Sequence, residues 1–413
     1  MRSIKKVIYD EAIPGLEALL NGLGISDLEW KAMPAEAIDA KQLFGADALF
    51  IRSQTKVTSE MIRGSSVGFV GSCTIGTDHV DLDALQQAGI LFAHAPGCNA
   101  RAVVEYVMAT ALHWTQEKQR LDDQLTLGII GYGHIGRVLE QVFGIVTGQP
   151  LACRVYDPPL QHANDKREEP AVVRPLAGWR SLGEVLACDV VSVHVPLTDA
   201  SQSKWPTRGF LGQKELGSLK DQCFINTARG EVVTSAGIKV ASQHADIALD
   251  VFPSEPAVDP QLLASLWQAT PHIAGYSARG KWGGTWQVFQ QFSQWLLSES
   301  RAPESLNAPG DSDTPQFEAL YSLWMEDTWG LSAWAQLANW VVSLEDLSAQ
   351  MVSMGSSLPC SESIAQAFQN LRRNYKPRPE WFDVQLGAPL LTKDTRDQLR
   401  SAGLGKVLGV LEA

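Results

Sequence analysis

Three residues, Arg229, Glu255 and His272, have the side chains that oxidation of a 2-hydroxy acid requires. Histidine suits a reversible proton transfer, because its unperturbed pKa of about 6.5 lies close to neutral pH. Glu255 can pair with the imidazole, fix its tautomer and stabilise the imidazolium form, as the acid of a catalytic triad does. Arg229 can bind the substrate carboxylate and the C2 oxygen through its planar guanidinium. We therefore predict His272 as the general base of a hydride-transfer reaction.

A glycine motif lies upstream, between an apolar run and a helical pattern, which is the context that a dinucleotide-binding turn requires. The motif comprises Gly131, Gly133, His134, Ile135 and Gly136. Its glycines allow a tight turn and let a pyrophosphate approach the helix N-terminus. Asp157 follows about 20 residues later, where a carboxylate can accept hydrogen bonds from ribose hydroxyls and repel a 2′-phosphate. The motif predicts NAD in preference to NADP, and the alternative is a glycine turn that binds no cofactor.

Short apolar runs alternate with amphipathic stretches through most of the chain, and this alternation predicts an α/β fold with parallel sheets. The predicted strands cover residues 6–9, 48–51, 68–71, 91–93, 125–130, 152–156, 190–195, 222–226 and 247–251. Arg229, Glu255 and His272 each lie beyond a strand end, where ligands of open α/β sheets bind. This order favours a catalytic role for His272 over the structural role that an isolated histidine usually has. Asp250 is expected beside the nicotinamide, unless it serves as a helix cap or turn carboxylate.

The same pattern predicts two Rossmann-like parallel-sheet domains, one inserted into the other, and a third region. Residues 1–99 and 276–302 are predicted to form a substrate-binding domain, and residues 100–275 an NAD-binding domain. A polar linker rich in breakers begins at residue 303. Residues 303–413 are predicted to form a C-terminal α+β dimerisation domain, because aromatic residues favour interfaces. The alternative is a layer that packs within the same chain. The tryptophans of this region are Trp324, Trp329, Trp334, Trp340 and Trp381.

The composition is that of an ordinary globular protein, with 413 residues, 45% hydrophobic residues and a formal net charge of −12. The excess of acidic residues disfavours a nucleic-acid or acidic-membrane surface, because binding phosphates needs clustered cations. No secretory signal or long apolar run is present, so we expect a cytoplasmic protein. The six cysteines have no C-x-x-C spacing and are expected to be reduced thiols. No histidine pair has metal-site spacing, and we assign no metal.

The motifs together resemble the D-isomer-specific 2-hydroxyacid dehydrogenase family across most of the first 295 residues. The resemblance rests on the glycine motif, Asn226-Thr-Ala-Arg229-Gly, Glu255-Pro and His272. Stretches that begin at residues 73, 95 and 272 are similar to one branch of this family, which acts on 4-phospho-D-erythronate. Residues 368–381 are similar to the basic, aromatic stretch in the C-terminal dimerisation domain of that branch.

The resemblance implies NAD-linked oxidation of 4-phospho-D-erythronate to 2-oxo-3-hydroxy-4-phosphobutanoate, in pyridoxal 5′-phosphate biosynthesis, by a homodimer. It implies that Ser53, Thr74 and Tyr276 bind substrate, and Arg52 or Lys56 could meet the phosphate charge. The residues implied to line the NAD site are Thr227, Ala228, Arg229, Asp250 and Gly275. Val195 stands where the family usually has threonine. A backbone contact with the cofactor is expected there in place of a hydroxyl contact.

Two other functions stay open at this point. The chain could act on another phosphorylated 2-hydroxy acid, such as 3-phosphoglycerate, although Tyr276 and residues 368–381 argue against this. It could also be a non-enzymatic NAD-sensing regulator, since related corepressors keep the glycine motif. Such proteins can retain the arginine, glutamate and histidine as well, so only a turnover assay separates a regulator from an enzyme.

Overall fold

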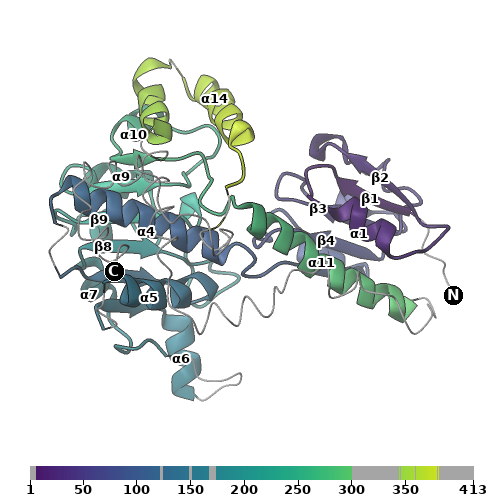
Figure 1. Cartoon of the computed structure of the whole chain (residues 1–413), viewed down its shortest axis with the longest axis horizontal. Coiled ribbons are helices and arrows are strands. Elements are labelled where there is room, and N and C mark those ends of the chain that lie inside the picture. The colour runs from purple at the N-terminus through teal and green to yellow at the C-terminus, as the bar shows by residue number, and fades with distance from the viewer. Residues whose placement is uncertain are drawn as a thin grey trace, which may run out of the picture. The chain divides into compact units, whose positions relative to one another are not determined.

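The structure is a computed structural model that describes residues 6–120, 124–147, 151–166, 174–299, 344, 346–358, 360–378 and 380. The chain divides into two compact units (Figure 1). The first unit contains the described residues up to Asn99 and the segment that begins at Ser277. The second contains Ala100–Tyr276 and the described residues from 344 to 380, which we call the C-terminal segment.

The first unit is built on a five-stranded parallel sheet in the order β2-β1-β3-β4-β5. Its strands are β1 (Lys6–Asp10), β2 (Glu29–Met33), β3 (Ala48–Ile51), β4 (Phe69–Ser72) and β5 (Leu91–His94). Its helices are α1 (Leu16–Gly22), the short 3₁₀ helix η1 (Ala35–Ala37), α2 (Ser59–Ile62), α3 (Leu82–Gln87) and α11 (Ala278–Glu299). Helix α11 packs on β4 and β5 and adds Val288 and Phe292 to the cluster around Phe50 and Phe69. A late segment of the sequence thus completes the core of the N-terminal sheet.

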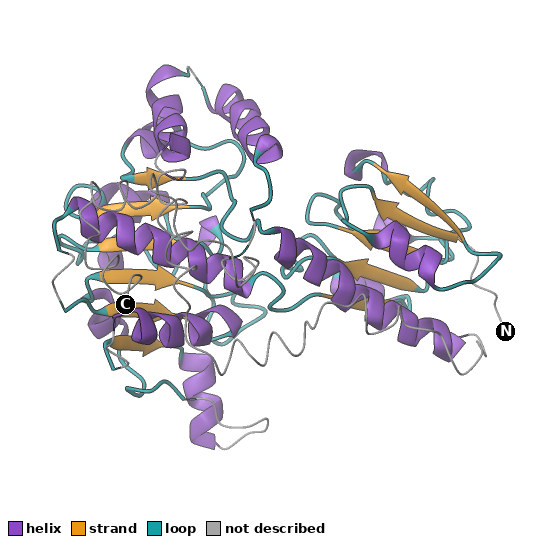
Figure 2. Cartoon of the chain, in the orientation of Figure 1, coloured by secondary structure: helices purple, strands orange, loops and turns teal. Residues whose placement is uncertain are grey.

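The second unit is built on a six-stranded parallel sheet in the order β11-β10-β9-β8-β6-β7 (Figure 2). Its strands are β6 (Leu127–Ile130), β7 (Cys153–Tyr156), β8 (Val190–Val193), β9 (Cys223–Asn226), β10 (Asp246–Leu249) and β11 (Gln268–Ala269). Its helices are α4 (Ala100–Glu117), α5 (His134–Thr147), α6 (Pro158–Lys166), α7 (Leu182–Leu186), α8 (Gln213–Leu216), η2 (Gly230–Val232), α9 (Ser235–Ala241), α10 (Pro260–Ala264) and α14 (Ser361–Asn374). The predicted α/β class with two parallel sheets is confirmed.

The central strands of the second sheet are easy to predict from the sequence. Every residue of β6, β8 and β9 is buried, because helices cover both faces of a parallel sheet. Such strands are continuous apolar runs, as in Val-Val-Ser-Val of β8. The strands β2 and β11 were not predicted. In β2 only Met33 is buried, and β11 has two residues, so neither gives an apolar run.

The C-terminal segment packs into the core of the second unit. Ile364 and Phe368 lie on one face of α14 and are buried, as are Met351 and Met354 in the helical residues 346–357. The ring of Phe368 lies edge-on to Phe252 with a centroid separation of 6.0 Å. The described part of this region therefore packs within its own chain. The predicted dimerisation domain is otherwise outside the described residues, as are its five tryptophans.

Other expectations concern membranes, metals and thiols. No helix among the described residues is long and apolar enough to cross a membrane. No group of three metal-binding side chains is found in the described ranges. All six cysteines are free; four are buried and two, Cys98 and Cys360, are half-buried.

Candidate active site

The glycine motif forms the turn between β6 and α5, at the carboxyl end of the second sheet. Gly131 has a φ of +97°, in the region that side chains disfavour. A Cβ on Gly131 would lie 2.6 Å from the His194 carbonyl oxygen, and a Cβ on Gly136 would collide with the Gly131 carbonyl. Both positions therefore require glycine, one for the turn and one for the close approach of α5.

This turn lies at the point where the strand order reverses. The chain passes from β6 to β7 on one side and then to β8 on the other. Ligands of doubly wound sheets bind at such a switch point. The His194 amide donates to the Ile130 carbonyl at 2.7 Å, and the Val195 side chain lies beside Gly131. The loops after β6 and β8 thus meet where a dinucleotide is expected.

Asp157 joins the glycine turn to the start of α6. One carboxylate oxygen accepts the Tyr132 amide at 2.8 Å, and the other accepts the Leu160 amide at 2.9 Å. The carboxylate therefore caps a helix and holds the turn, two roles that the sequence did not indicate. Each oxygen keeps a further lone pair, so ribose hydroxyls can still bind to it.

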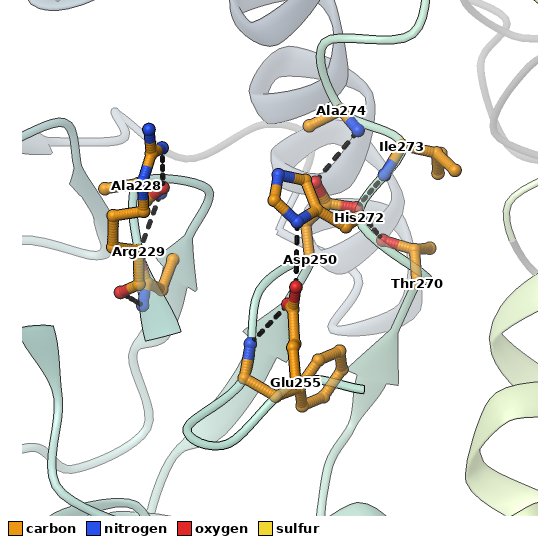
Figure 3. A network of polar contacts seen from close by, with 10 residues as sticks. Ala228, Arg229, Asp250, Glu255, Thr270, His272, Ile273 and Ala274 are labelled. Carbon is orange, nitrogen blue, oxygen red and sulfur yellow. Dashed lines mark hydrogen bonds and ion pairs between the residues drawn. The ribbon is translucent and has the colours of Figure 1, made fainter. Parts of the chain in front are cut away.

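Glu255 and His272 form a hydrogen-bonded pair (Figure 3). The His272 Nδ1 lies 2.9 Å from Glu255 Oε2, and Glu255 Oε1 accepts the Phe252 amide at 2.8 Å. Burial alone would raise the pKa of Glu255. The His272 charge and hydrogen bond, the Phe252 amide and the Arg372 charge outweigh it and lower that pKa. Glu255 is therefore ionised at neutral pH, and His272 presents Nε2 on the opposite edge of the ring.

Asp250 holds the turn that carries His272. Its buried carboxylate accepts the Thr270 hydroxyl at 2.7 Å and the amides of Ile273 and Ala274 at 2.7 and 2.9 Å (Figure 3). Burial raises the pKa of Asp250. His272 has a φ of +57°, a conformation that costs a non-glycine residue about 1–3 kcal/mol. Asp250 stabilises this turn, and its expected contact with the nicotinamide stays a prediction.

Arg229 lies on the loop after β9, and buried Asn226 fixes that loop. The Asn226 side chain accepts the Ala228 amide and donates to the Arg229 carbonyl, both at 3.0 Å. The Arg229 guanidinium donates to the Ala228 carbonyl at 2.8 Å. Figure 3 shows Arg229 and His272 on separate loops of the same unit, with Asp250 beside His272. The predicted cation and base are therefore held by two rigid and separately anchored turns.

The fold agrees with the comparisons with known proteins. The family model for the catalytic domain of D-isomer specific 2-hydroxyacid dehydrogenases matches residues 7–407. The chain belongs to this family. It is 35% identical to the erythronate-4-phosphate dehydrogenase of Marinobacter nauticus, over 96% of this chain and 98% of that protein. It is 34% identical to the erythronate-4-phosphate dehydrogenase of Pseudomonas aeruginosa, over 91% of this chain and 93% of that one.

Solved structures of two less similar dehydrogenases share the fold. A D-lactate dehydrogenase from Aquifex aeolicus, in complex with NAD and lactic acid, has a TM-score of 0.57 and 23% identity, over 71% of this chain and 96% of that one. A 3-phosphoglycerate dehydrogenase from Entamoeba histolytica has a TM-score of 0.57 and 21% identity, over 72% of this chain and 97% of that one. These dehydrogenases are covered almost completely and leave more than a quarter of this chain unmatched.

The substrate residues implied by the family resemblance lie in both units. Ser53 is exposed on the loop after β3 in the first unit. Thr74 follows β4, and its hydroxyl lies 2.8 Å from Ser72 Oγ, which lies 3.0 Å from His79 Nε2. Tyr276 belongs to the second unit. Ser72 and His79 thus support Thr74, a role that the sequence did not indicate.

The structure also places residues near the second-unit site that the sequence did not single out. His194 lies 2.9 Å from Ser192 Oγ and 3.5 Å from Thr227 Oγ1, and burial lowers its pKa to about 3. A neutral His194 therefore supports Thr227 from the β8 loop. Thr270 could have been identified from the sequence, because it is a hydroxyl residue two positions before His272 in the same turn.

Proposed function

We propose that this protein oxidises 4-phospho-D-erythronate to 2-oxo-3-hydroxy-4-phosphobutanoate with NAD, a step of pyridoxal 5′-phosphate (vitamin B6) biosynthesis. The observation that carries the proposal is the Glu255–His272 pair at 2.9 Å, in the unit that also bears Arg229 and the glycine turn. The named function of relatives that match nearly the whole chain supports this substrate. The D-lactate dehydrogenase structure matches only 71% of this chain, whereas these relatives match more than 90% of it, which supports the proposal further.

The glycine turn fits a dinucleotide. A Cβ built on Gly133 would meet no atom within 4 Å, so space is open where a pyrophosphate would approach the backbone. The residues proposed to hold NAD are Gly131, Gly133, His134, Ile135, Gly136, Asp157, Val195, Thr227, Ala228, Arg229, Asp250 and Gly275. When bound, NAD supplies the acceptor for the hydride that leaves C2.

The protein's own side chains supply the rest of the chemistry. His272 Nε2 accepts the proton of the C2 hydroxyl, while Glu255 on Nδ1 stabilises the resulting imidazolium. Arg229 binds the C1 carboxylate and the C2 oxygen, which becomes the oxygen of the ketone. One hydroxyl proton goes to His272 and one hydride leaves C2, so the alcohol loses two electrons and two hydrogens. In the reverse direction His272 returns the proton.

We expect Glu255→Gln to move the acidic limb of the kcat/KM pH profile to lower pH. The base must be neutral to accept a proton, and the substitution removes the carboxylate charge beside Nδ1 of the ring. Because the pKa of Glu255 is lowered, its carboxylate is charged throughout the range in which histidine ordinarily titrates. Rates measured from about pH 5 to 9 test this. Exposed Glu231 in the same unit gives the control, Glu231→Gln. If the acidic limb stays at its original pH, Glu255 does not act on the base.

We expect Asp157→Ala to weaken NAD binding and to lower the preference for NAD over NADP about tenfold, the worth of one charged hydrogen bond. The substitution removes the repulsion of a 2′-phosphate and the contact with the Tyr132 amide. The measurement is kcat/KM for each cofactor. Asp165→Ala, at an exposed position on α6, is the matched control. If the preference stays constant, another residue sets it.

The direct test of the function is NADH formation with a panel of 2-hydroxy acids. The panel contains 4-phospho-D-erythronate, D-erythronate, 3-phospho-D-glycerate and D-lactate. We expect the highest kcat/KM with the first acid. A preference for 3-phospho-D-glycerate would favour the other phosphorylated substrate, and NAD binding without turnover of any acid would favour a regulator.

Two further properties are proposals. We propose a homodimer, because residues 368–381 resemble a stretch of the C-terminal dimerisation domain in one branch of the family. Light scattering of the full chain tests this. Truncation after Ala302 would be a poor test of the dimer. It would remove Met351, Ile364 and Phe368 from the core of the second unit. A cytoplasmic location also stays a prediction.

A further inference from the structure

The C-terminal segment reaches the catalytic residues of its own unit. After α14 the chain passes Tyr276, whose carbonyl accepts the Arg378 amide at 3.3 Å. The Arg378 guanidinium pairs with buried Glu105 of α4 and donates to the Ala102 carbonyl at 2.8 Å. The C-terminal segment crosses the turn at Tyr276 and is anchored on both sides of it. The apolar face of α14 is one anchor, and the Arg378–Glu105 ion pair is the other.

This anchoring places Arg372, in the last turn of α14, over the ring of Tyr276. The guanidinium carbon lies 5.7 Å from the ring centroid, within the range of a cation–π contact. Tyr375 covers the same ring at a centroid separation of 6.4 Å. Stacking on a ring orients a guanidinium but leaves its edge donors available for an anion. Arg372 is thus a pre-positioned cation beside a residue that is implied to bind substrate.

The hydrogen bonds of Arg372 are incomplete. Its Nε is buried and has no hydrogen-bond partner among the described residues, although buried donors normally have one. The positive charge acts on Glu255, yet both Glu255 oxygens are already bound, by His272 and Phe252. In Figure 3 the yellow-green ribbon of the C-terminal segment lies on the side of His272 away from Arg229. The charge of Arg372 is therefore close enough to act on the partner of the predicted base, and it comes from a different segment of the chain from Arg229.

This arrangement matches an acid that carries an anion at each end. Arg372 lies over Tyr276, a residue implied to bind substrate, and is available to the anionic end that the Arg229 contact leaves free. We propose that Arg372 binds the phosphate of the substrate and so selects a phosphorylated acid over its unphosphorylated counterpart. This inference rests on the proposed function. It also assigns the C-terminal segment a role in specificity, in place of the Arg52 or Lys56 contact considered from the sequence.

The test compares kcat/KM for 4-phospho-D-erythronate and D-erythronate in the parent and in variants. Arg372→Gln should lower the ratio of the two values about 10- to 100-fold, the range for a lost charged hydrogen bond. Arg372→Lys should retain part of the ratio, because lysine keeps the charge without the fork. Arg373→Gln, at the exposed neighbouring position, is the matched control and should keep the ratio.

A second readout does not depend on turnover. Inorganic phosphate should compete with the phosphorylated substrate, and its inhibition constant should rise in Arg372→Gln. Equal losses for both substrates, with unchanged phosphate inhibition, would overturn the proposal. The proposal would also be overturned if Arg52→Gln or Lys56→Gln lowered the ratio of the two kcat/KM values and Arg372→Gln did not. A parent enzyme that does not oxidise 4-phospho-D-erythronate would instead contradict the proposed function itself.

Discussion

The variant His272→Asn should lose roughly 10²–10⁴-fold in kcat, the usual worth of general acid–base catalysis, with little change in NAD affinity. Asparagine is suited to this test because it tolerates positive φ better than most residues, and His272 has a φ of +57°. Its amide can also still hydrogen-bond to Glu255. The turn is therefore expected to keep its shape while the titrating group is lost.

Steady-state rates and an NAD titration give the two measurements for His272→Asn. His244→Asn is the control, because this histidine is exposed in the same unit. A variant with kcat within about threefold of the parent would remove His272 from the mechanism, since that loss falls far short of the acid–base range.

Arg229→Lys should lower kcat/KM about 10²- to 10³-fold, although it keeps the positive charge. Lysine cannot bind the carboxylate and the C2 oxygen with two parallel donors, and each charged hydrogen bond contributes about 1.5–3 kcal/mol. The Asn226 contacts use the backbone of this loop, so they survive the substitution. The loss should therefore report substrate binding in the transition state and not a misfolded loop.

The measurement for Arg229→Lys is kcat/KM for the best acid of the substrate panel, with thermal unfolding as a check on folding. Arg208→Lys provides the matched control, because Arg208 forms a half-exposed pair with Asp199 at 2.7 Å. Such a pair contributes at most about 1 kcal/mol to stability. Near-parental kcat/KM in Arg229→Lys would show that a single charge is enough at this position.

The sequence predicts strands best where both faces of the strand are buried. The residues of β3 and β8 form apolar runs because helices or loops cover both sides of the sheet, and their predicted bounds differ little from those observed. In the edge strand β2 both Glu29 and Lys31 are exposed, so its pattern is that of a loop. Edge strands carry charges for a physical reason, because charge discourages pairing with another chain.

Some residues of the candidate site can be predicted from their own stretch of sequence, and others depend on contacts with distant segments. Arg229, Glu255 and His272 follow strand ends, so topology alone brings them to one edge of the sheet. The role of Asp250 depends on which donors face its carboxylate, and these are fixed by the backbone of a turn near residue 272. Arg372 gives no local signal, because its place beside Tyr276 results from packing of α14. Their catalytic and binding roles stay predictions.

The interleaving of the two units has a consequence for synthesis on the ribosome. The N-terminal sheet acquires α11 only after the whole of Ala100–Tyr276 has been made, and that stretch acquires Met351 and Phe368 later still. At roughly 5–20 residues per second, both units remain incomplete for several seconds or more after their first strands emerge. Closing such long loops also slows folding. The nascent chain therefore exposes two unfinished apolar faces at once, the situation in which chaperones protect a protein.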